Sequence, residues 1–173
     1  EGEDIDIESN GLQSMWSSPL KIEYCKFRRH QHGLAVLNGD AIMHHTEFYD
    51  LHPYGSYDYD GAPIDCGYIA NGSAKVYDCI FRDSRGGFGV QEMTNKSDTN
   101  VNNCRFENIF NIALTVAKYG HVANCDFDSN SGIAMSLGSF EGLIENCNFS
   151  NGYGGALRGG DISFSSNCNK GLV

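Results

Sequence analysis

The sequence lacks the features that place many chains in a membrane or in a disulfide scaffold. It has no run of 18 apolar residues, so no segment reads as a transmembrane helix. Its 7 cysteines include no Cys-x-x-Cys pair and no zinc-ligand spacing. Residues 1–7 have neither a basic region nor an apolar one, so we expect no signal peptide in this segment.

Basic residues are few, since 12 Lys and Arg stand against 22 Asp and Glu, for a net charge of −10. This charge disfavours nucleic acid and anionic membrane surfaces as partners. An acidic polysaccharide is also disfavoured unless local basic groups or a cation offset the charge. We therefore expect no nucleic-acid partner, no membrane insertion and no cofactor, with calcium left open.

A short pattern occurs twice within residues 121–149. Asn124-Cys125-Asp126-Phe127 is followed 22 residues later by Asn146-Cys147-Asn148-Phe149. The cysteine belongs to a longer column in steps of 21, 33, 25, 21, 22 and 21 residues: Cys25, Thr46, Cys79, Cys104, Cys125, Cys147 and Cys168. Two residues later a second column holds Phe27, Phe48, Phe81, Phe106, Phe127 and Phe149, and ends at Lys170. Such a period is the signature of a repeat protein.

The repeat length predicts three short strands per unit. A unit of 21–22 residues is too short for a helical hairpin, and the leucine spacing of a leucine-rich repeat is absent. Alternation such as Cys-x-Phe has period two, as in a strand. Stacked coils place equivalent residues about 4.7–4.9 Å apart, so each column becomes a ladder. Asn before the cysteine suits a bend because it tolerates left-handed backbone.

This Asn-Cys-x-Phe repeat resembles the right-handed parallel β-helix of pectate-lyase-like proteins. The resemblance covers residues 5–173 and implies an all-β solenoid with three parallel sheets and about seven coils. We expect one β-helix domain over 1–173, with 5–20 as an incomplete first coil. Because the repeat is already under way at the start, we expect the chain to be a fragment of a longer protein.

The cysteines are expected to be buried free thiols, with a metal site or a disulfide bridge as the alternative. Six of the seven share one inward column and alternate with Phe, and Cys66 alone lies off it. A free Cys behaves as a small buried hydrophobe.

Two insertions interrupt the repeat, at residues 49–61 and 91–99. Both insertions adjoin the set of strands that comes after the Phe-containing strands. The first insertion precedes one of these strands and the second follows another. In solenoids such insertions usually mark the binding face. We expect Leu34, Phe88, Ile112 and Ile133 to point inward on these strands. A flat outward row is expected to hold Ala35, Gly89, Ala113, Ala134 and Ala156.

The first insertion carries the candidate chemistry. Glycoside hydrolysis needs two carboxylates roughly 5–10 Å apart, and the expected outward row has none. Any catalytic carboxylate must then come from the insertions, at Asp50, Asp58, Asp60, Asp65 or Glu92. Asp58 and Asp60 are the candidates for acid–base work or cation binding, and His52 or Arg85 for the positive group. The substrate-binding candidates are Tyr54, Tyr57, Tyr59 and Glu92. A solvated loop whose tyrosines pack on the coil is the alternative.

The best interpretation is a polysaccharide-recognising β-helix, possessing glycosidase, lyase or epimerase activity if it is an enzyme. A phage tail spike or a related carbohydrate-active protein, at a virion surface or outside the cell, is the expected setting. The alternative is a structural stem without catalysis. Since exposed strand edges invite aggregation, we expect a homo-oligomer, with a trimer as one arrangement, or capping by adjacent domains.

Overall fold

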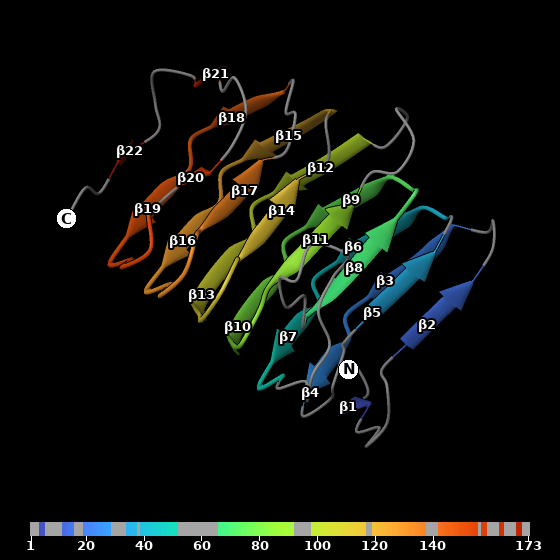
Figure 1. The fold of residues 1–173 in the computed structure, drawn as a ribbon. Coiled ribbons are helices and arrows are strands. Elements are labelled where there is room, and N and C mark those ends of the chain that lie inside the picture. Colours follow the sequence, from blue (N-terminus) through green and yellow to red (C-terminus); the bar gives the residue numbers. More distant parts are fainter. Residues whose placement is uncertain are drawn as a thin grey trace.

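Three parallel sheets wind around one core in a computed structural model of the chain (Figure 1). The structure describes residues 4–5, 12–15, 19–28, 34–37, 39–51, 66–91, 98–116, 119–137, 142–155, 157–158, 163–164 and 169–170. From β1 to β19, each strand pairs in parallel with the strand three places on, so the chain forms a parallel β-helix. The predicted all-β solenoid with three parallel sheets is confirmed. Among the described residues, no helix has the length and apolarity needed to cross a membrane.

Each sheet takes one strand from each coil. Sheet A consists of β1 (Asp4–Ile5), β4 (Lys26–Arg28), β7 (Glu47–Tyr49), β10 (Ile80–Ser84), β13 (Arg105–Ile109), β16 (Asp126–Asp128), β19 (Asn148–Ser150) and β22 (Asn169–Lys170). Sheet B consists of β2 (Leu12–Met15), β5 (Leu34–Leu37), β8 (Gly67–Ala70), β11 (Phe88–Gln91), β14 (Leu114–Val116), β17 (Met135–Leu137) and β20 (Leu157–Arg158). Sheet C consists of β3 (Leu20–Glu23), β6 (Ala41–His44), β9 (Ala74–Tyr77), β12 (Asp98–Asn102), β15 (Tyr119–Ala123), β18 (Leu143–Glu145) and β21 (Ser163–Phe164).

A column of stacked phenylalanine rings forms the centre of the core. Phe27, Phe48, Phe81, Phe106, Phe127 and Phe149 are all buried, with neighbouring ring centroids 4.7 to 5.1 Å apart. The planes of neighbouring rings differ by no more than 9°. This spacing is the distance between paired strands, and it falls within the range favoured by aromatic pairs. The predicted phenylalanine ladder is confirmed.

The cysteine column lies beside the phenylalanines and closes the bend between sheets C and A, which we call the C–A bend. In each described cysteine of the column, Sγ donates to the carbonyl two residues earlier, at 3.1 to 3.3 Å. Thr46 occupies the same column and its hydroxyl donates in the same way to His44 O at 3.0 Å. The column therefore supplies a hydrogen-bond donor as well as buried volume. Cys25 is half-buried and the other four are buried, which confirms the predicted inward ladder.

The residue before each cysteine has a left-handed backbone. At Tyr24, His45, Asp78, Asn103, Asn124 and Asn146, φ lies between 49° and 57°. A second left-handed row lies two residues after the phenylalanines, on the bend between sheets A and B, which we call the A–B bend. It contains Asp50, Asp83, Asn108, Ser129 and Asn151, with φ between 50° and 55°. The two rows turn the chain at the same place in each coil.

The predicted orientation along sheet B is partly wrong. Leu34 and Phe88 are buried as expected, but Phe88 pairs with Leu114 rather than with Ile112. Ile112 and Ile133 are half-buried residues ahead of their strands. In these later coils, one more residue separates the phenylalanine from the first inward residue of sheet B. The spacing of apolar residues in the sequence therefore predicts the wrong strand register there.

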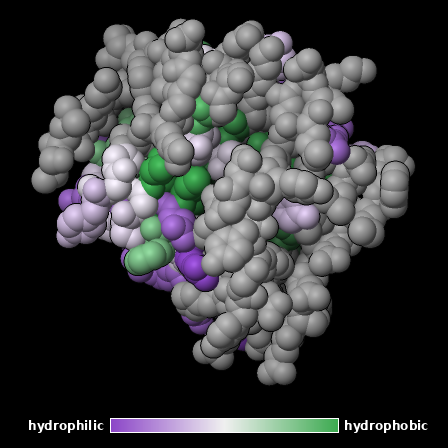
Figure 2. Space-filling model, in the orientation of Figure 1, coloured by the Kyte–Doolittle hydropathy of each residue, from purple (hydrophilic) through white to green (hydrophobic). Residues whose placement is uncertain are grey.

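The predicted flat Ala/Gly row is wrong for two of its described residues. Ala113 and Ala134 are buried, with 0% and 6% of their surface exposed. A Cβ on Gly87 would overlap the carbonyl group of Ala113, which shows how closely the coils approach at this corner. The outward positions of sheet B include Gly89, as predicted, together with Tyr68, Thr115 and Ser136. Figure 2 shows only small hydrophobic areas beside hydrophilic residues on the coloured part of the surface. Ala156 lies outside the described residues.

Both insertions flank sheet B, as predicted, with altered limits. Tyr49 ends β7, and Asp50 and Leu51 still belong to the A–B bend, so the first insertion falls within residues 52–65. Gln91 ends β11 and Asp98 begins β12, so the second stretch is 92–97. Both inserted stretches lie outside the described residues.

Truncation of a ring in the middle of the ladder should strongly destabilise the protein. Phe127 is 1% exposed and stacks on Phe106 and Phe149. We expect Phe127→Ala to lower the free energy of unfolding by about 3–5 kcal/mol, measured by urea denaturation. Phe110, 67% exposed, is the matched control, and Phe110→Ala should change it by no more than about 0.5 kcal/mol. A loss below about 1 kcal/mol for Phe127→Ala would contradict the core assignment.

The buried thiols should react only after unfolding. None of the six forms a disulfide, and five of them are buried. Desolvation raises the pKa of the Cys104 thiol well above its ordinary value, and only the thiolate reacts readily. With iodoacetamide, we expect Cys25 to be modified first and the buried thiols only in guanidinium. Mass spectrometry without reduction measures both results, and a chain with more than one disulfide would refute this expectation.

Candidate functional site

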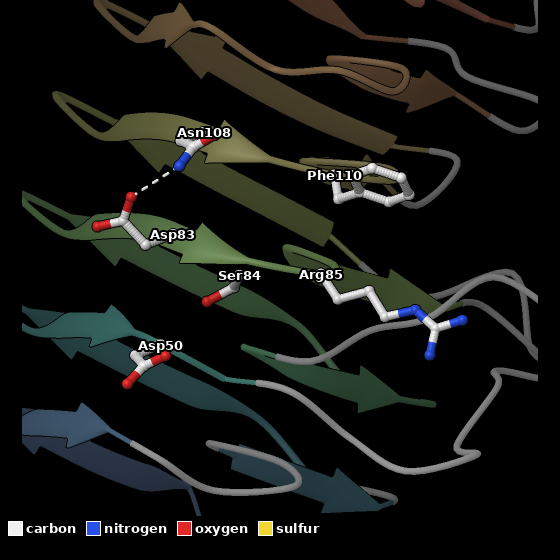
Figure 3. Close-up of a pocket in the computed structure, with 6 residues that line it drawn as sticks. All are labelled: Asp50, Asp83, Ser84, Arg85, Asn108 and Phe110. Atoms are coloured by element: carbon white, nitrogen blue, oxygen red, sulfur yellow. Dashed lines mark hydrogen bonds between the residues drawn. The ribbon is translucent and has the colours of Figure 1, made fainter.

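A hollow of about 550 Å³ opens on the A–B bend. It is lined by Asp50, Asp83, Ser84, Arg85, Asn108 and Phe110. Figure 3 shows Asp50, Asp83 and Asn108 on three successive coils, with Arg85 and Phe110 on the other side. The hollow lies directly before the inserted stretch 52–65, because Asp50 and Leu51 lead into that stretch. A described pocket and an insertion therefore meet at this bend.

The floor of the hollow is held by buried polar side chains. The N–H of Leu51 donates to Ser84 Oγ at 3.2 Å, and Ser84 Oγ donates to Arg82 O at 2.9 Å. On the coils that follow, Asn130 accepts from the N–H of Ile109 at 2.8 Å and donates to Phe106 O at 3.1 Å. Buried polar groups satisfied in this way make a bend rigid. The exposed residues next to them are therefore held in fixed positions.

Asp83 is an ionised carboxylate that lines the hollow. Its Oδ1 accepts from Asn108 Nδ2 at 2.9 Å, and its Oδ2 accepts from Arg82 at 2.7 Å. The hydrogen bond from Asn108 and the neighbouring Arg82 hold the pKa of Asp83 below its ordinary value. A carboxyl group with a lowered pKa does not serve as a general acid near neutral pH. Asp83 therefore suits a role as an acceptor for hydroxyl groups or as a fixed negative charge.

The Arg82 side chain contacts residues on the outer surface of sheet A. Its Nε lies 2.7 Å from Glu47 Oε1, and its guanidinium lies over the Tyr49 ring at 4.8 Å from the centroid. The hydrogen bond to Glu47 raises the pKa of Arg82. Arg82 therefore links two neighbouring coils across the outer face of sheet A.

Two of the predicted residues are described and line the hollow, the candidate cation Arg85 and the candidate carboxylate Asp50. In Figure 3 the Arg85 side chain extends away from the carboxylates of Asp50 and Asp83. The backbone N–H of Arg85 donates to Leu51 O at 3.3 Å, which anchors its backbone to the coil before. The remaining candidates lie outside the described residues, namely His52, Tyr54, Tyr57, Asp58, Tyr59, Asp60, Asp65 and Glu92.

A row of residues runs along the A–B bend, beginning with Arg85 and Phe110 of the hollow. The backbone N–H groups of Arg85, Phe110, Ser131 and Tyr153 each donate to the coil before, so these residues stack one per coil. Phe110 and Tyr153 are 67% and 92% exposed, the highest values among the large hydrophobic side chains described. With coils about 4.8 Å apart, two steps separate them by about 10 Å. We call this row the A–B ridge.

Four residues of the hollow are absent from the candidates that the sequence suggests. Asp83 and Asn108 belong to the polar column two residues after each Phe, while Ser84 and Phe110 stand close behind that column. The signal that could have found them is the column itself, whose members are Asp50, Asp83, Asn108, Ser129 and Asn151. Such a regular column is less conspicuous in the sequence than an insertion.

The Right handed beta helix region family model matches residues 10–169. The chain belongs to the right-handed β-helix family. This agrees with the predicted handedness and with the pairing of every strand in the structure, while the pectate-lyase-like subdivision is not distinguished. The fold is compatible with a carbohydrate-related or a structural β-helix in general.

Other comparisons add little. No curated protein matches the chain significantly. Two solved structures are of trypsin-treated, singly substituted forms of QnrB1, a plasmid-mediated fluoroquinolone resistance protein. They are 14% and 11% identical, cover 89% and 91% of this chain and 92% of their own, and have TM-scores of 0.20 and 0.22. Scores this low support no inference about fold or function.

Metal ligands do not gather in the part of the chain that the structure describes. No group of three or more His, Cys, Asp or Glu side chains there is placed to hold an ion. Asp58 and Asp60 lie outside that part, so calcium binding by the insertion stays a prediction.

Acid should destabilise the protein partly through the A–B bend. Because the folded pKa of Asp83 is lowered, its contribution is present above the unfolded pKa of about 3.9 and is lost as pH falls through the folded pKa. We expect urea midpoints to decrease as the pH falls below about 4. Asp83→Asn retains a residue suited to left-handed backbone and should decrease less steeply. An identical acid dependence in parent and variant would contradict the assignment.

Proposed function

We propose that this protein recognises a polysaccharide along the A–B ridge, with the stretch 52–65 beside it. The observation that carries the proposal is the coincidence of three features on one bend. They are the hollow, the two most exposed large hydrophobic side chains described, and the longer insertion. Binding groups are usually placed on loops supported by a rigid scaffold.

The chemistry of the ridge is that of a sugar site. Phe110 and Tyr153 present ring faces to which the apolar face of a sugar can bind. Asp83 accepts hydrogen bonds and Arg85 brings a positive charge to the same hollow. Each coil adds one residue to the row, so a chain-like ligand lying parallel to the solenoid axis meets a new contact at every step. A single small ligand would not contact both the Phe110 and the Tyr153 ring, because they are about 10 Å apart.

The proposed polysaccharide-binding surface differs from the one expected from the sequence. A flat Ala/Gly row over sheet B was the expected floor, but Ala113 and Ala134 of that row are buried. The outward positions of sheet B also include Tyr68, Thr115 and Ser136. The A–B ridge replaces it as the proposed floor.

Catalysis, if present, would use carboxylates of the insertion. Asp58 and Asp60 remain the candidates for acid–base work, with His52 or Arg85 as the positive group and Tyr54, Tyr57, Tyr59 and Glu92 as binding residues. Asp50 stands one coil before Asp83 at the same bend position. The proposal includes the setting in a phage tail spike or a secreted enzyme, and assembly as an oligomer.

Calorimetry against capsular, lipopolysaccharide and plant glycans tests the proposal. We expect the parent to bind at least one, and Phe110→Ala or Tyr153→Ala to weaken it at least tenfold, about 1.4 kcal/mol. Tyr57→Ala, Tyr59→Ala and Asp60→Asn test the insertion in the same way. Tyr119→Ala, an aromatic on sheet C with 38% exposure, is the matched control and should bind as the parent does.

The outcomes separate the alternatives. If a glycan binds and none of the ridge or insertion variants weakens it, the site lies elsewhere. If no glycan binds, the structural stem becomes the favoured function. Product analysis then distinguishes reaction types, since a glycosidase creates reducing ends, a lyase creates unsaturated ends and an epimerase leaves the chain length unchanged.

A further inference from the structure

The C–A bend departs from its own repeat in the first three coils whose bend residue is described. The later coils have Asn103, Asn124 and Asn146 at the left-handed position, and Asn tolerates that conformation well. The earlier coils have Tyr24, His45 and Asp78 there instead. His and Asp also tolerate this conformation, but a bulky tyrosine with positive φ is strained, and strained residues gather at ligand sites. The first three described C–A bends therefore lack the Asn that the later coils have at this position.

The two aromatic substitutions form one platform. The rings of Tyr24 and His45 stack with centroids 4.8 Å apart and planes 19° apart. Tyr24 remains 61% exposed, the highest value among the large hydrophobic side chains described outside the A–B ridge. Stacking on His45 fixes the orientation of the tyrosine ring while much of its surface stays open to a ligand.

A second hollow of about 550 Å³ lies against this platform. Besides the two rings, it is lined by Lys26, Glu47, Asp78 and the 38% exposed Ile80, among others. It therefore combines an aromatic face, an aliphatic side chain, an ammonium group and two carboxylates. We call it the C–A hollow.

The polar groups of the C–A hollow have capacity for a ligand. Asp78 Oδ1 accepts from Asn103 Nδ2 at 2.5 Å, but Oδ2 lies 4.0 Å from His45 Nε2, beyond hydrogen-bond distance. Lys26 Nζ is 3.9 Å from Glu47 Oε2, and its side chain is 57% exposed. One acceptor and one donor thus stand beside the ring with room for further hydrogen bonds.

We propose that the C–A hollow binds a neutral pyranose unit as a second, separate site. A pyranose has an apolar C–H face that matches Tyr24 and Ile80, and hydroxyl groups that both donate and accept. Asp78 accepts from one hydroxyl and Lys26 donates to another. The mixed charges of the hollow favour a neutral ring over an acidic one, as does the net charge of −10. This site lies on a different bend from the A–B ridge and goes beyond the function proposed there.

Saturation-transfer NMR with methyl β-glucopyranoside, methyl β-galactopyranoside and methyl α-mannopyranoside at millimolar concentration tests this site. We expect transfer to at least one of them from the parent, and at least a tenfold weaker affinity for Tyr24→Asn. Asn restores the bend residue of the later coils, so this variant should melt at the parent's temperature or above. Asp78→Asn, which also suits the bend, removes the carboxylate and should weaken binding as well. Tyr119→Ala is the control.

The results distinguish the two proposed sites. Loss of pyranoside binding in Tyr24→Asn with unchanged polysaccharide binding supports the C–A hollow as a separate site. If no pyranoside receives saturation from the parent, or if both Tyr24→Asn and Asp78→Asn bind as the parent does, the inference is overturned. Failure of polysaccharide binding on the A–B ridge would leave these measurements unaffected, because they use monosaccharides and different variants.

Discussion

Parallel pairing of each strand with the strand one coil away is the constraint on which the structure depends. It fixes the distance between equivalent residues at the strand spacing of about 4.8 Å. Like side chains must then lie directly on like, and only some side chains do this favourably. Flat rings stack at this distance, as Phe81, Phe106 and Phe127 do at 4.8 Å. The ladder is therefore a consequence of the pairing as much as a cause of it.

The same constraint explains why the bends carry so much hydrogen bonding. A chain that turns at the same place in every coil must satisfy its backbone at every bend. At the C–A bend, a thiol or hydroxyl donates to the carbonyl two residues earlier, and Thr46 shows that the donor matters more than the sulfur. At the A–B bend, the buried side chains of Ser84 and Asn130 accept hydrogen bonds from backbone N–H groups of the neighbouring coil. The interior is thus regular because each coil repeats the same local requirements.

Irregularity is therefore informative in this protein. A substitution in a column either disturbs the stacking or serves something outside the coil. Tyr24 and His45 stand at left-handed bend positions where the later coils have Asn, and they stack on each other beside a hollow. Phe110 and Tyr153 expose aromatic rings on a bend where polar residues would be expected at solvent-exposed positions. Both departures lie on bends rather than on sheet faces, because the bends carry side chains that neither the core nor the strand pairing requires.

The sequence by itself determined the solenoid, its three parallel sheets, and the inward columns of Cys and Phe, because a short period with strand alternation allows few folds. It also located the insertions on either side of sheet B. It did not determine the register of Leu114 against Phe88, since one added residue at a bend changes the pairing without changing the apolar pattern. Only the tertiary structure decided which side chains meet across coils. Asn108 lies 25 residues after Asp83 in the chain, yet both line one hollow because adjacent coils stack at the strand spacing.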